Sequence, residues 1–171
     1  CNGDTKGSIG LTISGGSGNY TYSWTGPAGF TASTRDLSGL KAGNYTCLVR
    51  ALNGCDLTPL PSFTLTEPLP LVINAPGLSV SSDGAYNIKC YGTNTGSITI
   101  NVSGGSIGNY SYNWSTINGS GIINGQKDQS ALTAGTYHME VTDVNGCTTA
   151  KEITHTQPYV LVTQMSVKNI N

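Results

Sequence analysis

Hydrophobic and polar residues alternate with a period of two along much of the chain. Residues 8–14 read SIGLTIS and residues 97–103 read SITINVS, with an aliphatic side chain at every second position. Such alternation is typical of a strand that buries one face. Gly and Asn interrupt these segments, and strong helix formers are scarce. The pattern therefore predicts short strands joined by tight turns.

A second alternating segment is aromatic and occurs twice. Residues 20–24 read YTYSW and residues 110–114 read YSYNW. We expect Trp24 and Trp114 to fill the space between two packed sheets, because aromatic side chains bury a large area there. The tyrosines two and four positions earlier share the face of each tryptophan, so core packing is the favoured interpretation. Facing outward, they would instead form a stacking platform for sugars.

These segments belong to a longer internal repeat with a period of about ninety residues. That period fits an independent β-domain rather than a solenoid unit. The last match indicates that the residues after Pro158 resemble the start of another copy. The matching pairs are residues 1–24 with 90–114, 40–49 with 132–141, 52–55 with 144–147, and 66–73 with 156–163.

Each copy carries a phrase typical of a tyrosine corner, LKAGNY at 40–45 and LTAGTY at 132–137. The hydroxyl of Tyr45 or Tyr137 would bond back to the local backbone. An Asn-Gly pair follows in each copy and predicts a hairpin turn. We therefore predict an all-β chain of two tandem immunoglobulin-like sandwiches.

The predicted boundaries follow the prolines that end each copy. Residues 1–68 form the first copy and lack its first strand, and residues 69–158 form the second. Residues 159–171 begin a third copy or form a tail strand. Under the second interpretation, the first copy exposes a sheet edge and the tail offers a strand, so molecules would associate by strand donation.

Composition narrows the class of protein. The chain of 171 residues has a net charge of -1, and only 10% of its residues are charged. Ordinary globular domains carry about 25% charged residues. The absence of a basic stripe argues against nucleic acid as a partner. No apolar run approaches the roughly 18 residues of a membrane helix, so membrane insertion is not expected.

Five cysteines in a chain rich in hydroxyl residues suggest an oxidising, extracellular setting. Cys1 and Cys90 occupy one repeat position, and Cys55 and Cys147 another, so three pairings of these four are open. The repeat favours Cys1–Cys55 and Cys90–Cys147, although this pairing requires the segment before each GSI to fold back. Cys47 is expected to be a small buried hydrophobe.

No residue set predicts catalysis, a cofactor or a metal. His138 and His155 have no nucleophile at a suitable spacing and are interpreted as surface or rim histidines. Asp143 begins a fragment of a calcium loop, but a hairpin turn explains its Asn-Gly pair. The aspartates show no pair at equivalent positions of the two copies, and they are Asp4, Asp36, Asp56, Asp83, Asp128 and Asp143.

Five motifs occur in the same order in both copies: C-x-G-x-x-x-G-S-I, S-G-G, Y-x-Y-x-W, L-x-A-G-x-Y and N-G-C. Together they resemble the SprB-type repeat of very large surface adhesins in gliding bacteria. The resemblance implies a location at the bacterial cell surface, export by the type IX secretion route, and roles in adhesion and gliding motility.

The leading functional hypothesis is thus a structural and adhesive repeat module whose partners are neighbouring repeats of the same chain. The alternative is a carbohydrate-binding or spacer module of a secreted multidomain protein, with a surface polysaccharide as partner. An enzyme is not expected.

Overall fold

The computed structural model describes residues 1–15, 18–57, 59–106, 108–166 and 168. It divides into two compact units, Cys1–Leu69 and Pro70–Asn171, each with its own core. Residues 16–17 and 107, which precede the two aromatic segments at 20–24 and 110–114, lie outside the described residues. So does the end of the predicted third copy, at 167 and 169–171.

The first unit is a sandwich of two antiparallel sheets. One sheet pairs β1 with β4, and the other has the order β3-β2-β5-β6. A short 3-10 turn, η1, follows β2. The elements are β1 (Gly7–Ile9), β2 (Tyr20–Thr25), η1 (Pro27–Gly29), β3 (Thr31–Ala32), β4 (Leu37–Leu40), β5 (Gly43–Ala51) and β6 (Ser62–Leu65).

Alternation along these strands builds the first core. Residues 45, 47, 49 and 51 of β5 are buried, while the residues between them are more exposed. Trp24 of β2 has no exposed surface and packs in the same cluster as Ile9 and Leu40 of the opposite sheet. The core therefore lies between the two sheets, as in other sandwiches.

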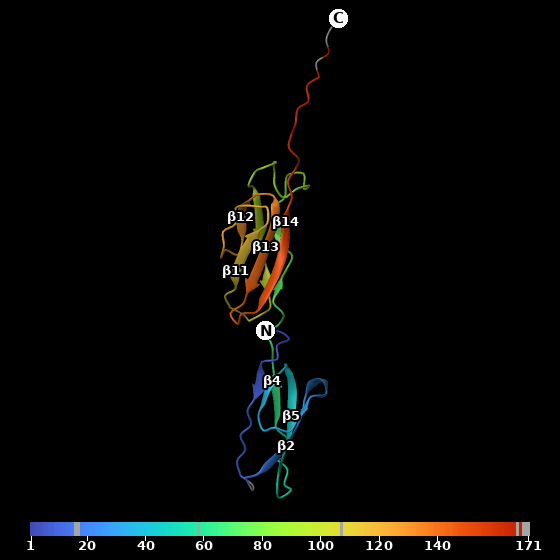
Figure 1. Cartoon of the computed structure of the whole chain (residues 1–171), viewed down its shortest axis with the longest axis vertical. Coiled ribbons are helices and arrows are strands. Elements are labelled where there is room, and N and C mark those ends of the chain that lie inside the picture. The colour runs from blue at the N-terminus through green and yellow to red at the C-terminus, as the bar shows by residue number, and fades with distance from the viewer. Residues whose placement is uncertain (16–17, 58, 107, 167, 169–171) are drawn as a thin grey trace. The chain divides into compact units, whose positions relative to one another are not determined.

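The second unit repeats this plan and adds two short strands at its start. Its larger sheet has the order β11-β13-β14, and these strands lie side by side in Figure 1. The opposite side is formed by β12-β9-β8 and by β10-β7. The strands are β7 (Val72–Ile73), β8 (Gly77–Leu78), β9 (Gly96–Thr99), β10 (Val102–Ser103), β11 (Ser111–Thr116), β12 (Gln129–Leu132), β13 (Gly135–Thr142) and β14 (Thr148–His155).

The second core is built from equivalent positions. Trp114, Tyr137, Met139 and Val141 come from the larger sheet, and they pack in one cluster with Ile98 of the opposite sheet. The prediction of an all-β, sandwich-like fold is confirmed. Within the described residues, η1 is the only helical element, and no helix is long and apolar enough to cross a membrane.

Candidate functional site

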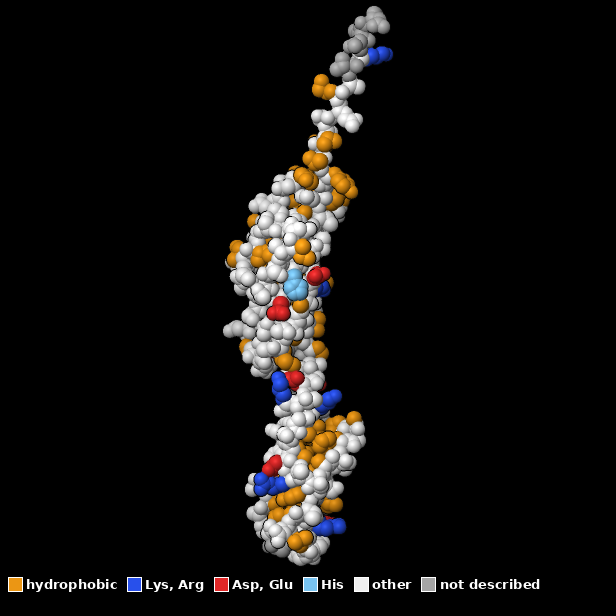
Figure 2. Space-filling view, in the orientation of Figure 1, with side chains coloured by type: hydrophobic (Ala, Val, Ile, Leu, Met, Phe, Trp, Pro, Cys, Tyr) orange, Lys and Arg blue, Asp and Glu red, His pale blue; other side chains and the backbone are white. Residues whose placement is uncertain are grey.

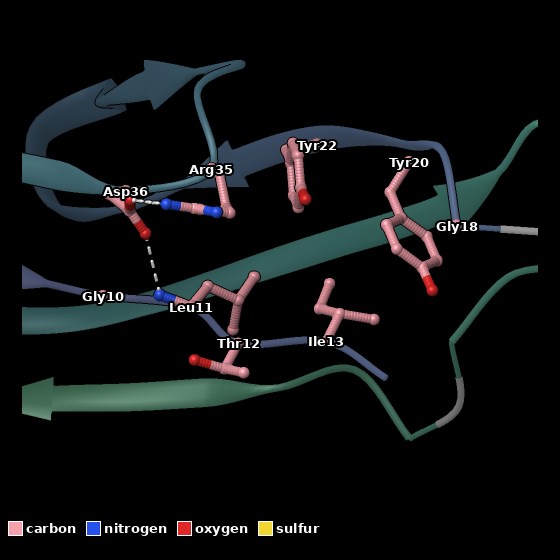
Figure 3. A pocket seen from close by; sticks show the side chains of 9 residues that line it. All are labelled: Gly10, Leu11, Thr12, Ile13, Gly18, Tyr20, Tyr22, Arg35 and Asp36. Atoms are coloured by element: carbon pink, nitrogen blue, oxygen red, sulfur yellow. Dashed lines mark hydrogen bonds and ion pairs between the residues drawn. The ribbon is translucent and has the colours of Figure 1, made fainter. Parts of the chain in front are cut away.

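A groove lies beside β2 in the first unit. It encloses about 510 Å³. Figure 3 shows the rings of Tyr20 and Tyr22 pointing from β2 toward the segment of residues 10–13. Both rings are half-buried and pack partly against the core, whereas Trp24 on the same face is fully enclosed. The tyrosines thus contribute to the core and also line an accessible groove.

A charged pair lies at one end of the groove, beside Tyr22 (Figure 3). Arg35 Nη2 donates to Asp36 Oδ2 at 2.7 Å, and Leu11 N donates to Asp36 Oδ1 at 3.0 Å (Figure 3). The Arg35 guanidinium, followed by the Leu11 amide, holds the pKa of Asp36 below its usual value. The groove therefore presents aromatic rings beside an ionised hydrogen-bonding pair.

The second unit has a carboxylate at the equivalent place. Asp128 Oδ1 accepts the amide of Ile100 at 2.8 Å, as Asp36 does from Leu11. The prediction that no carboxylates occupy equivalent positions is therefore wrong. Each aspartate lies four residues before a leucine, Leu40 or Leu132, that ends the following strand. This shared spacing is the signal that would have revealed the match.

In the second unit, residues between β11 and β12 lie beside the equivalent region. Gly125 N donates to the carbonyl of Tyr112 at 3.2 Å, and Ile122 packs against the core. Burial, followed by the nearby Tyr110, raises the pKa of the Tyr112 hydroxyl. The residues between β11 and β12 thus bond to the backbone of Tyr112, whose ring is half-buried like that of its counterpart Tyr22.

Two tyrosine corners brace the sandwiches. Tyr45 is buried and its hydroxyl donates to the carbonyl of Lys41 at 2.9 Å. Tyr137 is also buried and bonds to the carbonyl of Thr133 at 2.8 Å and to Ser120. In each copy the bond spans four residues and fixes the turn that precedes the longest strand.

The cysteines do not form the predicted bridges. Cys55 and Cys90 are free, exposed thiols, and Cys47 is a free thiol buried in the first core. The predictions of Cys1–Cys55 and Cys90–Cys147 bridges are therefore wrong.

The strand register gives the reason. The amide of Gly3 bonds to Glu67, beyond the end of β5 where Gly43 faces Leu65, whereas Cys55 bonds to Ala51 at the other end. A nine-residue strand separates the two cysteines by roughly 25 Å. A disulfide needs Cα atoms about 4.4–6.8 Å apart. The second copy has the same arrangement, because Gly92 bonds to Gln157 and Cys147 bonds to Asp143.

One histidine is also not where the sequence placed it. His138 is exposed, but His155 is only 2% exposed, so the prediction of a surface or rim position is wrong for His155. Its ring meets that of Tyr137 edge-on, with centroids 5.9 Å apart. Neither ring nitrogen has a hydrogen-bond partner among the described residues. Burial lowers the pKa of His155.

Asp143 organises a hairpin rather than a cluster of acidic ligands. Its carboxylate accepts the amides of Ser106, Asn145 and Cys147 at 2.8–2.9 Å. These bonds, led by that of Ser106, lower the pKa of Asp143. The described residues contain no group of three His, Cys, Asp or Glu side chains that would hold a metal ion.

Two sandwiches with matched cores, tyrosine corners and hairpins define a tandem-repeat β-sandwich protein. The family model of the SprB repeat matches the chain twice, at residues 1–29 and 85–119. The resemblance seen in the motifs is thus confirmed. The SprB repeat is a structural repeat and not an enzyme family, and it occurs in surface-exposed proteins. No curated protein matches the chain.

Proposed function

We propose that this chain is a structural and adhesive module of a large secreted surface adhesin that acts in gliding motility or surface attachment. The observation that carries the proposal is the double match to the SprB repeat on two sandwiches with the same internal plan. The low charge supports it, because long arrays of nearly neutral repeats repel each other little.

The proposed mechanism is passive and needs no catalysis. Each repeat is a sandwich with its own core, so added repeats extend the parent protein away from the cell without new chemistry. The type IX route would export the parent protein, and the bacterial cell surface would be its location.

The test is to locate and remove these repeats in the source bacterium. An antibody against residues 1–171 should label intact cells, and brief surface proteolysis should remove the label. In-frame deletion of the two repeats should reduce attachment to a solid surface or slow gliding. Labelling only after permeabilisation, or unchanged attachment and gliding, would contradict the proposal.

The groove of the first unit favours a second function, the binding of a neutral saccharide. Sugars present apolar C–H faces that stack on aromatic rings, and hydroxyl groups that bond to charged pairs. Tyr22 supplies such a ring, and no described residue bonds to its hydroxyl. Arg35 and Asp36 supply the polar side. The proposed site is that of the first unit, where the groove and the Arg35–Asp36 pair occur together.

A titration separates this function from a purely structural role. Amide resonances of isotope-labelled chain would be followed while laminarin, dextran or xylan is added. Binding predicts shifts at Tyr22 and Arg35 that Tyr22→Ala abolishes and Tyr112→Ala preserves. Shifts that survive Tyr22→Ala, or no shifts with any of the three polymers, would exclude this groove as a site for neutral sugars.

A further inference from the structure

The chain enters and leaves the second unit at opposite ends of its strands. At the entry, a Cβ atom on Gly105 would lie 2.8 Å from the Asp143 carboxylate and 3.0 Å from the Leu71 side chain, so Leu71 lies beside the turn between β13 and β14. At the exit, Thr156 follows the last residue of β14. That strand has eight residues and is therefore roughly 26 Å long. Tension that passes through the unit is thus directed along its strands.

Residues 72–79, next to the entry, are bonded along their length to residues 97–103. β7 pairs with β10 and β8 pairs with β9, both in antiparallel orientation. Between these two pairs, Asn74 N donates to the carbonyl of Asn101 at 2.9 Å. The hydrogen bonds of an antiparallel pair are perpendicular to the strands. Tension along residues 72–79 therefore loads these bonds together, in shear.

The strand next to the exit is held in the same way. β14 is antiparallel to β13 over eight residue pairs, of which the one nearest the exit includes His155. Tension that leaves at Thr156 pulls β14 along its own axis, so the bonds of this ladder are also loaded together. Both strands that receive the tension are thus loaded in shear, and neither is peeled from one end.

One side chain connects the two strands at the exit. Asn87 Nδ2 donates to the carbonyl of Ser79 at 3.1 Å, and Ser79 Oγ donates to the carbonyl of Asn87 at 2.8 Å. Thr156 N and Thr156 Oγ1 donate to Asn87 Oδ1 at 3.0 Å and 3.1 Å. The amides of Asn87 and Ile88 both donate to the carbonyl of Thr156. Asn87 therefore links two segments that tension pulls in opposite directions.

These contacts are hydrogen bonds between uncharged groups. The ion pairs of the described residues lie in the first unit, where they join Asp4, Asp36 or Asp56 to a positive group. Figure 2 shows few charged side chains on the visible face of the second unit. Salt screens the attraction between exposed charges. The mechanical resistance of the second unit should therefore be independent of ionic strength.

We propose that the second unit is a mechanical clamp, in which the ladder between residues 72–79 and 97–103 and the contacts of Asn87 resist tension along the chain. This role goes beyond that of a spacer, because a sandwich loaded across its strands would open bond by bond. The setting in which tension arises rests on the proposed function, a module of a surface adhesin. The clamp itself is measured on the purified chain, so its failure would be distinguishable from failure of that function.

The direction of pulling tests the clamp. The full chain is stretched in a single-molecule force experiment with reductant present, so that no disulfide carries the tension. Handles at the two ends of the chain load the ladder in shear. In the second arrangement, one handle is at the N-terminal end and the other replaces the side chain of Val144, which is exposed and follows Asp143. This arrangement peels residues 72–79 from the entry.

The force that unfolds the second unit should be several times higher with handles at the two ends than in the peeling arrangement. Each unit is recognised by the length of chain that it releases. The same measurement repeated at low and high salt should give the same force for the second unit.

Two substitutions test the contacts of the clamp. Asn87→Ala should raise the rate of unfolding under constant tension about tenfold, because the hydrogen bonds of its side chain are lost. Asn113→Ala is the matched control, since Asn113 is exposed on β11 and its side chain bonds to no described residue. Asn74→Pro removes an amide from the ladder and should lower the unfolding force. Ala75→Pro is its control, because the amide of Ala75 donates to no described residue.

Equal unfolding forces in the two pulling directions would overturn the proposal. An Asn87→Ala chain that resists tension as well as the original would do the same, as would equal losses from Asn74→Pro and Ala75→Pro. A force that falls with added salt would show that charged groups carry the tension instead. If Asn74→Pro does not fold, Asn87→Ala and the two pulling directions still decide the question.

Discussion

At the residue scale, the two copies differ most at one buried position. Gly43 faces Leu65 in the first unit, and Gly135 faces His155 at the same register of the second. In the first copy, the side chain that faces the glycine is therefore the aliphatic Leu65. The second encloses an imidazole with no hydrogen-bond partner among the described residues. An unsatisfied buried polar group costs about 1–3 kcal/mol.

His155 should make the second unit sensitive to acid. Burial lowers its pKa in the folded state, while the unfolded chain keeps a value near 6.5. Below about pH 6.5 the unfolded state therefore binds more protons, and stability falls as the pH falls. His155→Leu should raise the free energy of unfolding by about 1–3 kcal/mol and flatten its dependence between pH 7.5 and 5.5.

Urea unfolding at several pH values measures this effect. His138→Thr is the control, because His138 is exposed on the same sheet and should leave the pH dependence unchanged. If His155→Leu retains the full acid sensitivity of the original chain, another group is responsible.

At the element scale, a close approach of two backbones explains the Ala-Gly pair in both tyrosine-corner phrases. Gly135 begins β13 with a φ of 155°, and a Cβ atom there would lie 2.6 Å from the backbone of Gly119. Gly43 has the same role in the first unit, with a φ of 146° and Pro27 against it. A backbone neighbour cannot move aside as a flexible side chain can.

Gly135→Ala should therefore destabilise the second unit by about 3 kcal/mol, from strain and overpacking together. Gly125→Ala is the control, because Gly125 has a φ of 83° but open space around it, and should cost only about 1 kcal/mol. Thermal unfolding of the two variants compares them. Equal losses would show that packing against Gly119 is not the constraint.

At the scale of the whole molecule, the two compact units should unfold separately. Each contains one buried tryptophan, Trp24 or Trp114, so Trp114→Phe leaves a reporter of the first unit and Trp24→Phe leaves a reporter of the second. Fluorescence should give two different urea midpoints. A change from pH 7.5 to 5.5 should shift only the Trp114 transition, because His155 belongs to the second unit. Coincident midpoints with equal pH shifts would indicate one cooperative unit.

Much of each unit was predictable from local patterns. The period-two alternation placed Trp24 and Trp114 on strands with a buried face. The LKAGNY and LTAGTY phrases indicated the bonds of Tyr45 and Tyr137. These features depend on residues close together in the chain, whose geometry is set by the pleat of the strand and the tight turn.

Other features required the register between distant strands. The repeat matched Cys1 with Cys90 and Cys55 with Cys147. It did not show that the two cysteines of each copy lie at opposite ends of β5 or β13. Asp36 meets the amide of Leu11 only because β4 pairs with β1, and its match to Asp128 emerged from the same pairing. His155 lies at the end of β14 where Asn87 and Ile88 bond to the carbonyl of Thr156, a long-range contact that its own sequence does not indicate.

The sequence by itself determined the repeat, the all-β class, the faces of the strands and the resemblance to the SprB repeat. The tertiary structure alone decided which cysteines are too far apart to pair, which tyrosines line a groove, and which histidine is buried. The physical reason is that alternation specifies the face of a residue within its strand. Position along the strand and the identity of the neighbouring strand arise only when the sheets assemble.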